Sequence, residues 1–199
     1  MKKGYKLFLL LTAVLLFTAC SERSTYVPFL EEDKYGFKTI EGEVVIEPQF
    51  EEVKYFSENL APVKKNGQWG YISPDGKIAI EPRFQSAGPF HEGLAPIQKD
   101  GVWGYIDPKG KFIIQPQYQE ARYFAEGLAP VKKEDSWGYI DTDGNTALEF
   151  TYQAARPFTD GIGYVFVDGM WYSIDTEGNI ILSEEEKTQK EEQNSEEAE

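Results

Sequence analysis

The residue types that most often carry chemistry are either solitary or repeated in this sequence. It has one histidine, His91, and one cysteine, Cys20. Carboxylates are abundant, and one set recurs at a fixed interval: Glu58, Glu92, Glu126 and Asp160. An active site usually needs a few unique groups held in one place. The repeated carboxylates therefore indicate turns and solvated strand edges, where charge also discourages the addition of a further strand.

These residues carry no catalytic or metal-binding signature. The positions aligned with His91 hold Ser57, Ala125 and Thr159, which indicates a surface position rather than a catalytic one. Residues 141–144 resemble a calcium loop only superficially, because the glycine comes two places too early for an EF-hand. The sequence has neither a nucleophile elbow nor a spaced cluster of metal ligands. We therefore expect no enzyme activity, no cofactor and no metal.

Cys20 ends a segment of the kind that directs secretion. Three lysines precede an apolar run over 7–17, which has signal-peptide length and is too short to span a bilayer as a helix. The ending Phe-Thr-Ala-Cys resembles the lipobox of bacterial lipoproteins, in which the cysteine is acylated after cleavage, typically with palmitate-like chains. We expect residues 1–19 to be removed, Cys20 to carry lipid, and 20–25 to form a tether. Ordinary secretory cleavage after Ala19 is the alternative.

The charge balance argues against nucleic acid as a partner. The net charge is −14, and removal of the three lysines of the signal segment lowers it to −17. Phosphate binding needs a basic surface instead. Residues 183–199 hold eight glutamates against two lysines and no aromatic residue. Such a segment buries too little apolar surface to offset its ordering entropy, so we expect a disordered acidic tail; a short solvated helix is the alternative.

A repeat of 34 residues dominates the rest of the chain. The four tryptophans recur at this spacing: Trp69, Trp103, Trp137 and Trp171. The glycines of a following turn recur with them: Gly76, Gly110, Gly144 and Gly178. A fixed period of this length is the signature of a repeat architecture. The sequence predicts five units: 26–59, 60–93, 94–127, 128–161 and a shortened last unit, 162–182.

Each unit has the pattern of a three-stranded antiparallel meander, as residues 60–93 illustrate. The first strand ends at Asn66-Gly67, a pair that favours a type I′ hairpin turn. The second strand contains Trp69. A turn ending at Gly76, which we expect at positive φ, then leads into the third strand.

The stretch that joins one unit to the next breaks the two-residue alternation of strands. Its apolar residues lie three apart: Phe84, Ala87 and Phe90, then Tyr118, Ala121 and Phe124. That spacing suits a 3₁₀ turn or a packed irregular connector. The fourth unit also has Glu134-Asp135 in place of Asn-Gly, for which we expect a longer hairpin loop.

The last unit departs furthest from the pattern. Tyr172 stands where the other units have a glycine after the aromatic residue, and Tyr164 stands where they have proline. If that glycine makes room for the following unit, a tyrosine is tolerated only where no unit follows. Open arrays need such atypical ends. We therefore predict an all-β fold of tandem 34-residue meanders stacked as an open array, with a small closed five-bladed β-propeller as the alternative.

Aromatic residues make up 15% of the chain, enough both to pack a core and to contact ligands. We assign the repeated tryptophans to core packing. A tyrosine two residues after the tryptophan repeats on one predicted strand face and is the candidate for an exposed ladder that contacts ligand: Tyr71, Tyr105 and Tyr139.

The repeated phrase identifies a family by resemblance. Gly127 to Lys133 with Trp137 to Asp141, and likewise Gly93 to Gln117, resemble the WG (KWG) repeat family, and the resemblance covers about 26–182. It implies a β-rich repeat scaffold without a catalytic signature, often secreted or lipid-anchored in bacteria.

The resemblance and the predicted lipobox lead to one functional expectation. We expect a non-catalytic envelope lipoprotein, anchored through Cys20 on the extracytoplasmic side of the cell or outer membrane, that binds an envelope protein along its repeats. Recognition of wall glycan through the tyrosine ladder is the alternative.

Overall fold

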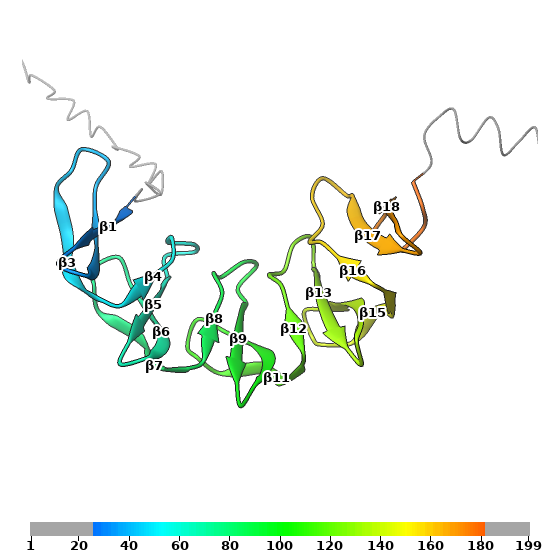
Figure 1. Ribbon diagram of the computed structural model, residues 1–199, viewed down its shortest axis with the longest axis horizontal. Helices are drawn as coiled ribbons and strands as arrows, with labels where there is room; N and C mark the ends of the chain where they lie inside the picture. Colours follow the sequence, from blue (N-terminus) through cyan, green and yellow to red (C-terminus); the bar gives the residue numbers. More distant parts are fainter. Residues whose placement is uncertain (1–25, 182–199) are drawn as a thin grey trace, which may run out of the picture.

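The computed structural model describes residues 26–181, which form eighteen strands and no helix (Figure 1). The predicted signal peptide, Cys20, the tether and the acidic tail lie outside the described residues, as does Leu182 at the end of the last predicted unit. No helix that could cross a membrane occurs among residues 26–181. The strands form five antiparallel sheets that follow one another along an open arc.

The sheets follow the order of the repeats. The first contains β1 (Val27–Glu31), β2 (Lys34–Lys38) and β3 (Val44–Phe50). The second contains β4 (Glu52–Val53), β5 (Ala61–Lys65), β6 (Gln68–Ile72) and β7 (Ile78–Phe84). The third contains β8 (Ser86–Ala87), β9 (Ala95–Lys99), β10 (Val102–Ile106) and β11 (Phe112–Tyr118). The fourth contains β12 (Glu120–Ala121), β13 (Leu128–Lys133), β14 (Ser136–Asp141) and β15 (Thr146–Tyr152), and the fifth β16 (Ala154–Ala155), β17 (Gly163–Val167) and β18 (Met170–Ile174).

Each sheet after the first combines residues of two successive units. The short strand β4 belongs to the first unit, yet it pairs with β5 of the second through Glu52–Lys64 and Val53–Val63. The strands β8, β12 and β16 repeat this arrangement. The start of the connector is thus extended, because its backbone groups find partners on the next unit. The meander prediction is confirmed and the 3₁₀ turn is wrong. Beyond its two-residue strand the connector is irregular and packed, with Phe90 and Phe124 buried, as the other connector prediction has it.

The hairpin turns have the backbone conformations that their sequences favour. Asn66 and Gly67 have φ values of 54° and 76°, as a type I′ turn requires. Glu134 and Asp135 adopt 49° and 66°, and Lys133 pairs directly with Ser136. The longer loop expected there is therefore wrong. The predicted positive φ is confirmed at the turn glycines Gly76, Gly110, Gly144 and Gly178, at 79°, 78°, 89° and 86°.

The glycine after each aromatic residue is required by its own unit. Three residues of β7 bulge past Gly70, because Trp69 pairs with Phe84 and Tyr71 with Ile80. A Cβ at Gly70 would lie 2.5 Å from the carbonyl oxygen of Ile80, too close for any side chain. The bulge also accommodates Pro82, which lacks an N–H. Our explanation that this glycine makes room for the following unit is therefore wrong.

The core lies between the units rather than within them. One face of the second unit contributes large side chains, including Trp69, Tyr71 and Phe84, and the third unit covers them with small and branched ones, including Ala95 and Ile97. Equivalent clusters lie at the other three junctions. Because the sheet faces of the inner units are covered on both sides, an isolated unit would expose much of this surface.

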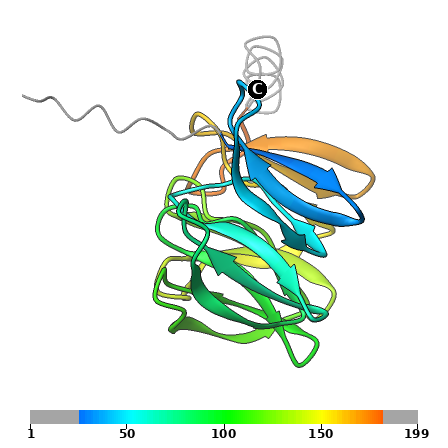
Figure 2. The ribbon, with the colours of Figure 1, turned by 90° about the vertical axis from the view of Figure 1, so that its left-hand side faces the viewer.

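The units form an open arc rather than a ring (Figure 1). The first and fifth sheets lie at the two ends of the arc, and a view from the first unit shows the successive sheets stacked around the curve (Figure 2). The open array is therefore confirmed over the described residues, and the closed five-bladed propeller is not formed.

Candidate functional site

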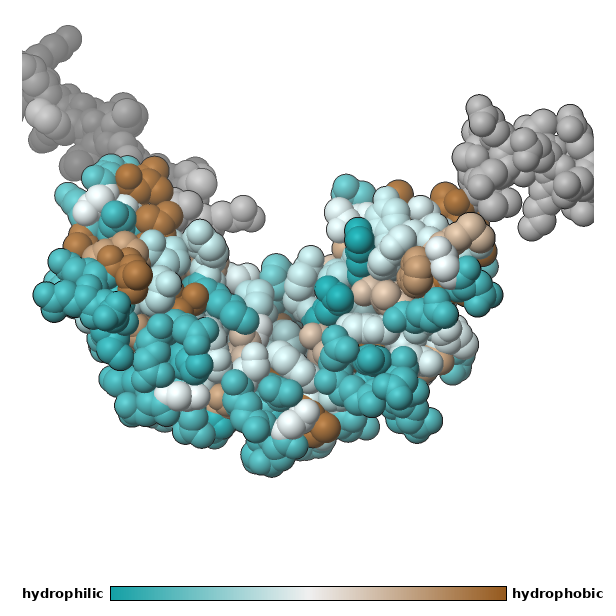
Figure 3. All heavy atoms as spheres, in the orientation of Figure 1, coloured by the Kyte–Doolittle hydropathy of each residue, from teal (hydrophilic) through white to brown (hydrophobic). Residues whose placement is uncertain are grey.

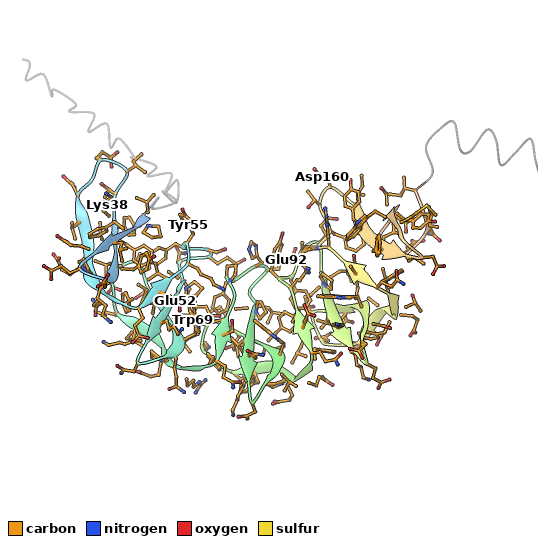
Figure 4. All side chains as sticks on the ribbon, viewed as in Figure 1. Lys38, Glu52, Tyr55, Trp69, Glu92 and Asp160 are labelled. Atoms are coloured by element: carbon orange, nitrogen blue, oxygen red, sulfur yellow. The ribbon has the colours of Figure 1, made fainter. Side chains whose placement is uncertain are left out.

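The turns that close the connectors lie on the inner side of the arc. We call this side the concave surface and define it by residues 54–59, 88–93, 122–127 and 156–161. Tyr55, Glu92 and Asp160, which belong to three of these segments, are labelled along it in Figure 4. Each segment follows a two-residue strand and ends in a turn with two residues at positive φ, such as Glu92 at 54° and Gly93 at 75°.

The repeated carboxylates link these turns to one another. Glu58 accepts a hydrogen bond from the backbone N–H of Gly93 at 3.0 Å. Glu92 accepts two, from the N–H groups of Glu126 at 2.7 Å and Gly127 at 2.9 Å. Glu126 in turn accepts from Gly161 at 3.0 Å. Each carboxylate thus caps the turn of the following unit with charge-assisted hydrogen bonds.

These carboxylates lie in turns and at solvated edges, as predicted from their recurrence in the sequence. Their contact with the next unit was not expected. Acceptor and donor lie 35 residues apart, and this spacing indicates a contact only when the units are known to stack in register.

Exposed aromatic residues also lie on the concave surface. The Tyr55 side chain is 70% exposed, and Tyr123 occupies the same position two units later with 38% of its surface exposed. Pro89 and Pro157 fill this position in the other two segments. The ring of His91 stacks on Tyr123, with 4.5 Å between the ring centroids. The space-filling view shows a largely pale concave surface of intermediate hydropathy (Figure 3).

In three of the four concave segments, a cation at the start of the segment covers a tryptophan of the next unit. The Lys54 ammonium lies 5.1 Å from the centre of the Trp69 ring. Arg122 lies 5.1 Å from the ring of Trp137, and Arg156 lies 4.5 Å from that of Trp171. Burial lowers the pKa of Lys54. These pairs hold the connectors against the tryptophan rings.

The predicted tyrosine ladder is buried. Tyr71, Tyr105 and Tyr139 have no exposed surface, so they are core residues and the prediction of an exposed ligand-contact ladder is wrong. Their hydroxyl groups donate to the backbone carbonyls of Gly88, Arg122 and Arg156, at 2.8, 2.7 and 2.7 Å. Burial raises the pKa of all three hydroxyl groups.

These tyrosines therefore position the concave segments instead of forming a site. Each ring packs on the phenylalanine of its own unit's connector, with centroid distances of 4.9, 4.8 and 5.1 Å to Phe90, Phe124 and Phe158. The hydroxyl bond and the ring contact together hold the connector at two points.

The tryptophans follow the core assignment in the inner units. Trp69 and Trp137 are only 6% and 5% exposed. Trp103 is partly buried, and Trp171 in the last unit is 46% exposed. His91 is half-buried, and the described residues hold no group of three or more potential metal ligands.

A small cavity of about 190 Å³ lies at the outer hairpin of the fourth unit. It is lined by Lys133, Glu134, Ser136 and Phe150. Small-molecule sites usually occupy about 300–1,000 Å³, so this cavity is an unpromising one. The concave surface is therefore the stronger candidate for recognition of another molecule.

The arc of stacked meanders defines this chain as a β-repeat protein, and comparison with known sequences specifies the family. The pattern of the WG containing repeat matches residues 35–69, 69–103, 103–136 and 137–171. The chain therefore belongs to the WG-repeat family. A search of the curated proteins finds no match.

Structures of Kluyveromyces lactis Hsv2 are among the solved structures with a similar fold. The structure titled Kluyveromyces lactis Hsv2 complete loop 6CD has a TM-score of 0.54 and 12% identity, over 83% of this chain and 61% of that one. A second structure of Kluyveromyces lactis Hsv2p gives a TM-score of 0.53 and 14% identity, over the same shares. This chain thus spans about three fifths of their length, and the likeness shows similarity of fold alone.

Proposed function

We propose that this WG-repeat protein is a non-catalytic scaffold that binds another protein on its concave surface, anchored to the cell envelope by lipid on Cys20. The observation that carries the proposal is the regular presentation of side chains from four successive units along one side of the arc. Repeat arrays commonly use such extended concave surfaces for binding.

The chemistry of the concave surface fits a protein partner. It combines exposed Tyr55 and Tyr123 with charged groups of both signs, among them Arg122, Glu126 and Asp160. Tyrosine and arginine are enriched in protein interfaces, since they bring both contact area and hydrogen bonds. The turns that present them are held by the carboxylate caps and by the buried tyrosines, which reduces the entropy lost on binding.

The anchor rests on the sequence. A basic segment, an apolar run and the ending before Cys20 support lipidation and an extracytoplasmic location at the cell or outer membrane. Two or three acyl chains hold a protein at a bilayer stably, whereas one binds only marginally. Radioactive palmitate incorporated into the wild type but not into Cys20→Ala would support this part of the proposal, and equal labelling would refute it.

The binding proposal is tested by capture of envelope material on protein that starts at Ser21. We expect retention of a protein, lost when the envelope material is first digested with protease. The double variant Tyr55→Ala, Tyr123→Ala should retain much less, because both side chains are exposed and their removal leaves the core intact. Ile113→Ala is the control, since Ile113 is 40% exposed on β11, at the convex side of the arc.

Recognition of glycan is the second candidate function. The residues that would contact the glycan differ from the buried tyrosines expected from the sequence. Exposed tyrosine rings can stack on sugars, and Tyr55 and Tyr123 are the repeated tyrosines that the structure exposes on the concave surface. Retention that survives protease but is lost after glycan digestion would overturn the proposal of a protein partner and favour this candidate.

A further inference from the structure

The third unit departs from the pairing of tryptophan with a cation. The residue that precedes the tryptophan by 15 positions is Lys54, Arg122 or Arg156 in three units, and each lies over its ring. Before Trp103 this position is Gly88, which has no side chain to cover the ring. Trp103 is accordingly partly exposed, whereas Trp69 and Trp137 are only 6% and 5% exposed.

Two further positions beside Trp103 are also uncharged, whereas the other inner units have an ion pair there. In the second unit, Lys64 lies opposite Trp69 and pairs with Glu52 at 2.6 Å. Lys132 and Glu120 repeat this ion pair in the fourth unit, at 3.5 Å. In the third unit the same positions hold Gln98, directly opposite Trp103, and Ser86. Two cations that flank the other inner tryptophans are thus missing here.

The backbone at Gly88 keeps this position free of a side chain. The N–H of Gly88 donates to the carbonyl of Pro96 at 2.7 Å, and its own carbonyl accepts from Tyr71 at 2.8 Å. A Cβ at Gly88 would lie 2.6 Å from Cγ of Pro96. The fold therefore holds this segment too close to Pro96 for the lysine or arginine of the other units.

The nearby cations of the chain are engaged elsewhere. Lys99 lies 5.6 Å from the ring centre of Phe112. Arg83 donates to the carbonyl of Gly110 at 2.7 Å and lies over Phe84. No cation of the described residues lies over the Trp103 ring.

We propose that the uncovered face of Trp103 binds an arginine side chain of the partner protein. This inference rests on the proposed function and names one contact within it. Tryptophan is the best aromatic acceptor for a cation, and arginine stacks on it more often than lysine does. Arg122 and Arg156 show that a guanidinium group fits over the equivalent rings. A chain with a net charge of −14 also favours a basic partner.

The test follows the four tryptophan indole N–H signals of the full-length, ¹⁵N-labelled protein by NMR. N-acetyl-arginine methylamide is added and compared with N-acetyl-citrulline methylamide, which has the same shape without the charge. We expect the Trp103 signal to shift with arginine and not with citrulline. The Trp69 and Trp137 signals should stay in place, because their rings are already covered.

Two variants at one position sharpen the test without altering the core. Gln98→Lys introduces the residue that the second and fourth units carry, so it should fold. It should weaken arginine binding by roughly two- to fivefold through repulsion, and Gln98→Glu should strengthen it by a similar factor. Tyr55→Ala is the control and should leave the Trp103 response unchanged.

Three results would overturn the proposal: an equal response to citrulline, shifts spread over all tryptophans, or no effect of charge at residue 98. Capture of a protein that depends on Tyr55 and Tyr123 would still support the scaffold in each of these cases. If the protein captured no envelope protein but the Trp103 signal still shifted with arginine, the scaffold proposal alone would be refuted.

Discussion

The inner units and the last unit differ at the positions where an inner unit needs a neighbouring strand. In the second unit, Gly70 faces the bulge of β7. In the last unit, Tyr172 occupies the equivalent position. Among the described residues, the third strand of that unit is reduced to the bridge between Ile174 and Ile180. Trp69 is 6% exposed, whereas Trp171 is 46% exposed. The last unit also has Ser173 where the inner units have a buried tyrosine.

The first unit is modified on its opposite face. Lys38 replaces the isoleucine that the other units bury against the preceding unit, such as Ile72, and its ammonium lies 5.5 Å from the ring centre of Phe29. Apolar side chains remain exposed at both ends, and the brown areas of Figure 3 gather on the two arms. At both ends of this array, residues whose role depends on a neighbouring strand or unit are thus replaced by others.

The largest predicted effect comes from exchanging the residues at the bulge. Gly104→Tyr should destabilise the protein by about 4 kcal/mol or more, because a Cβ there would lie 2.6 Å from the carbonyl oxygen of Ile114. Tyr172→Gly should cost only about 1 kcal/mol, since it removes a half-buried side chain. Urea unfolding measures both, and equal losses of stability would contradict the comparison.

A smaller effect is expected from the buried hydroxyl groups. Tyr105→Phe keeps the ring but leaves the carbonyl of Arg122 without its 2.7 Å donor, which should cost about 1–2 kcal/mol. Tyr164→Phe is the control in the last unit, where 42% of the side chain is exposed. Thermal melts should separate the two variants, and identical midpoints would mean that the hydroxyl bond adds nothing to stability.

The carboxylate caps offer a weaker contrast between the inner and last units. Glu92→Ala removes two hydrogen bonds to the next turn and should cost about 0.5–1 kcal/mol. Asp160→Ala should leave the melting temperature unchanged, because no closing turn follows it within residues 26–181. A loss of stability in the Asp160 variant equal to that in the Glu92 variant would show that the cap acts within its own turn.

Much of this fold was predictable because local chemistry repeats in every unit. Asn66-Gly67 and Gly76 favour the positive φ values that their turns require, so the hairpins and the meander could be predicted from them. The 34-residue period then required stacking. The error at Glu134-Asp135 arose because two residues without glycine can still adopt positive φ when the paired strands on either side demand it.

The candidate site was harder to predict because burial in this fold does not alternate along a strand. Tyr71 and Ile72 point to opposite faces of β6, yet neither has exposed surface, since another unit covers each face. A two-residue period therefore could not tell core from surface. Tyr55 and Tyr123 were missed because proline alternates with tyrosine at their position. Their place just before a closing turn was the signal that could have found them.

The smallest predicted effect is on the pH dependence of stability. It arises in the second hairpin turn, which the inner and last units share. Hydrogen bonds from Lys77 and Ser73 lower the pKa of Asp75 from 3.8 to about 2. In the last unit, hydrogen bonds from Asn179 lower the pKa of Asp175. Since folding lowers these pKa values, the carboxylates stabilise the fold above about pH 4, and this contribution is lost as the pH falls from about 4 towards 2.

Carboxyl NMR signals followed against pH test whether the two turns are equivalent. Asp75 and Asp175 should both titrate below 3.8, and Asp75→Asn should remove part of the acid-induced loss of stability. The effect should be small, because both side chains are exposed to solvent. If Asp175 titrated at its ordinary value while Asp75 did not, the turn of the last unit would need a following strand to form. The ends of the array would then differ from its interior in local structure as well as in contacts.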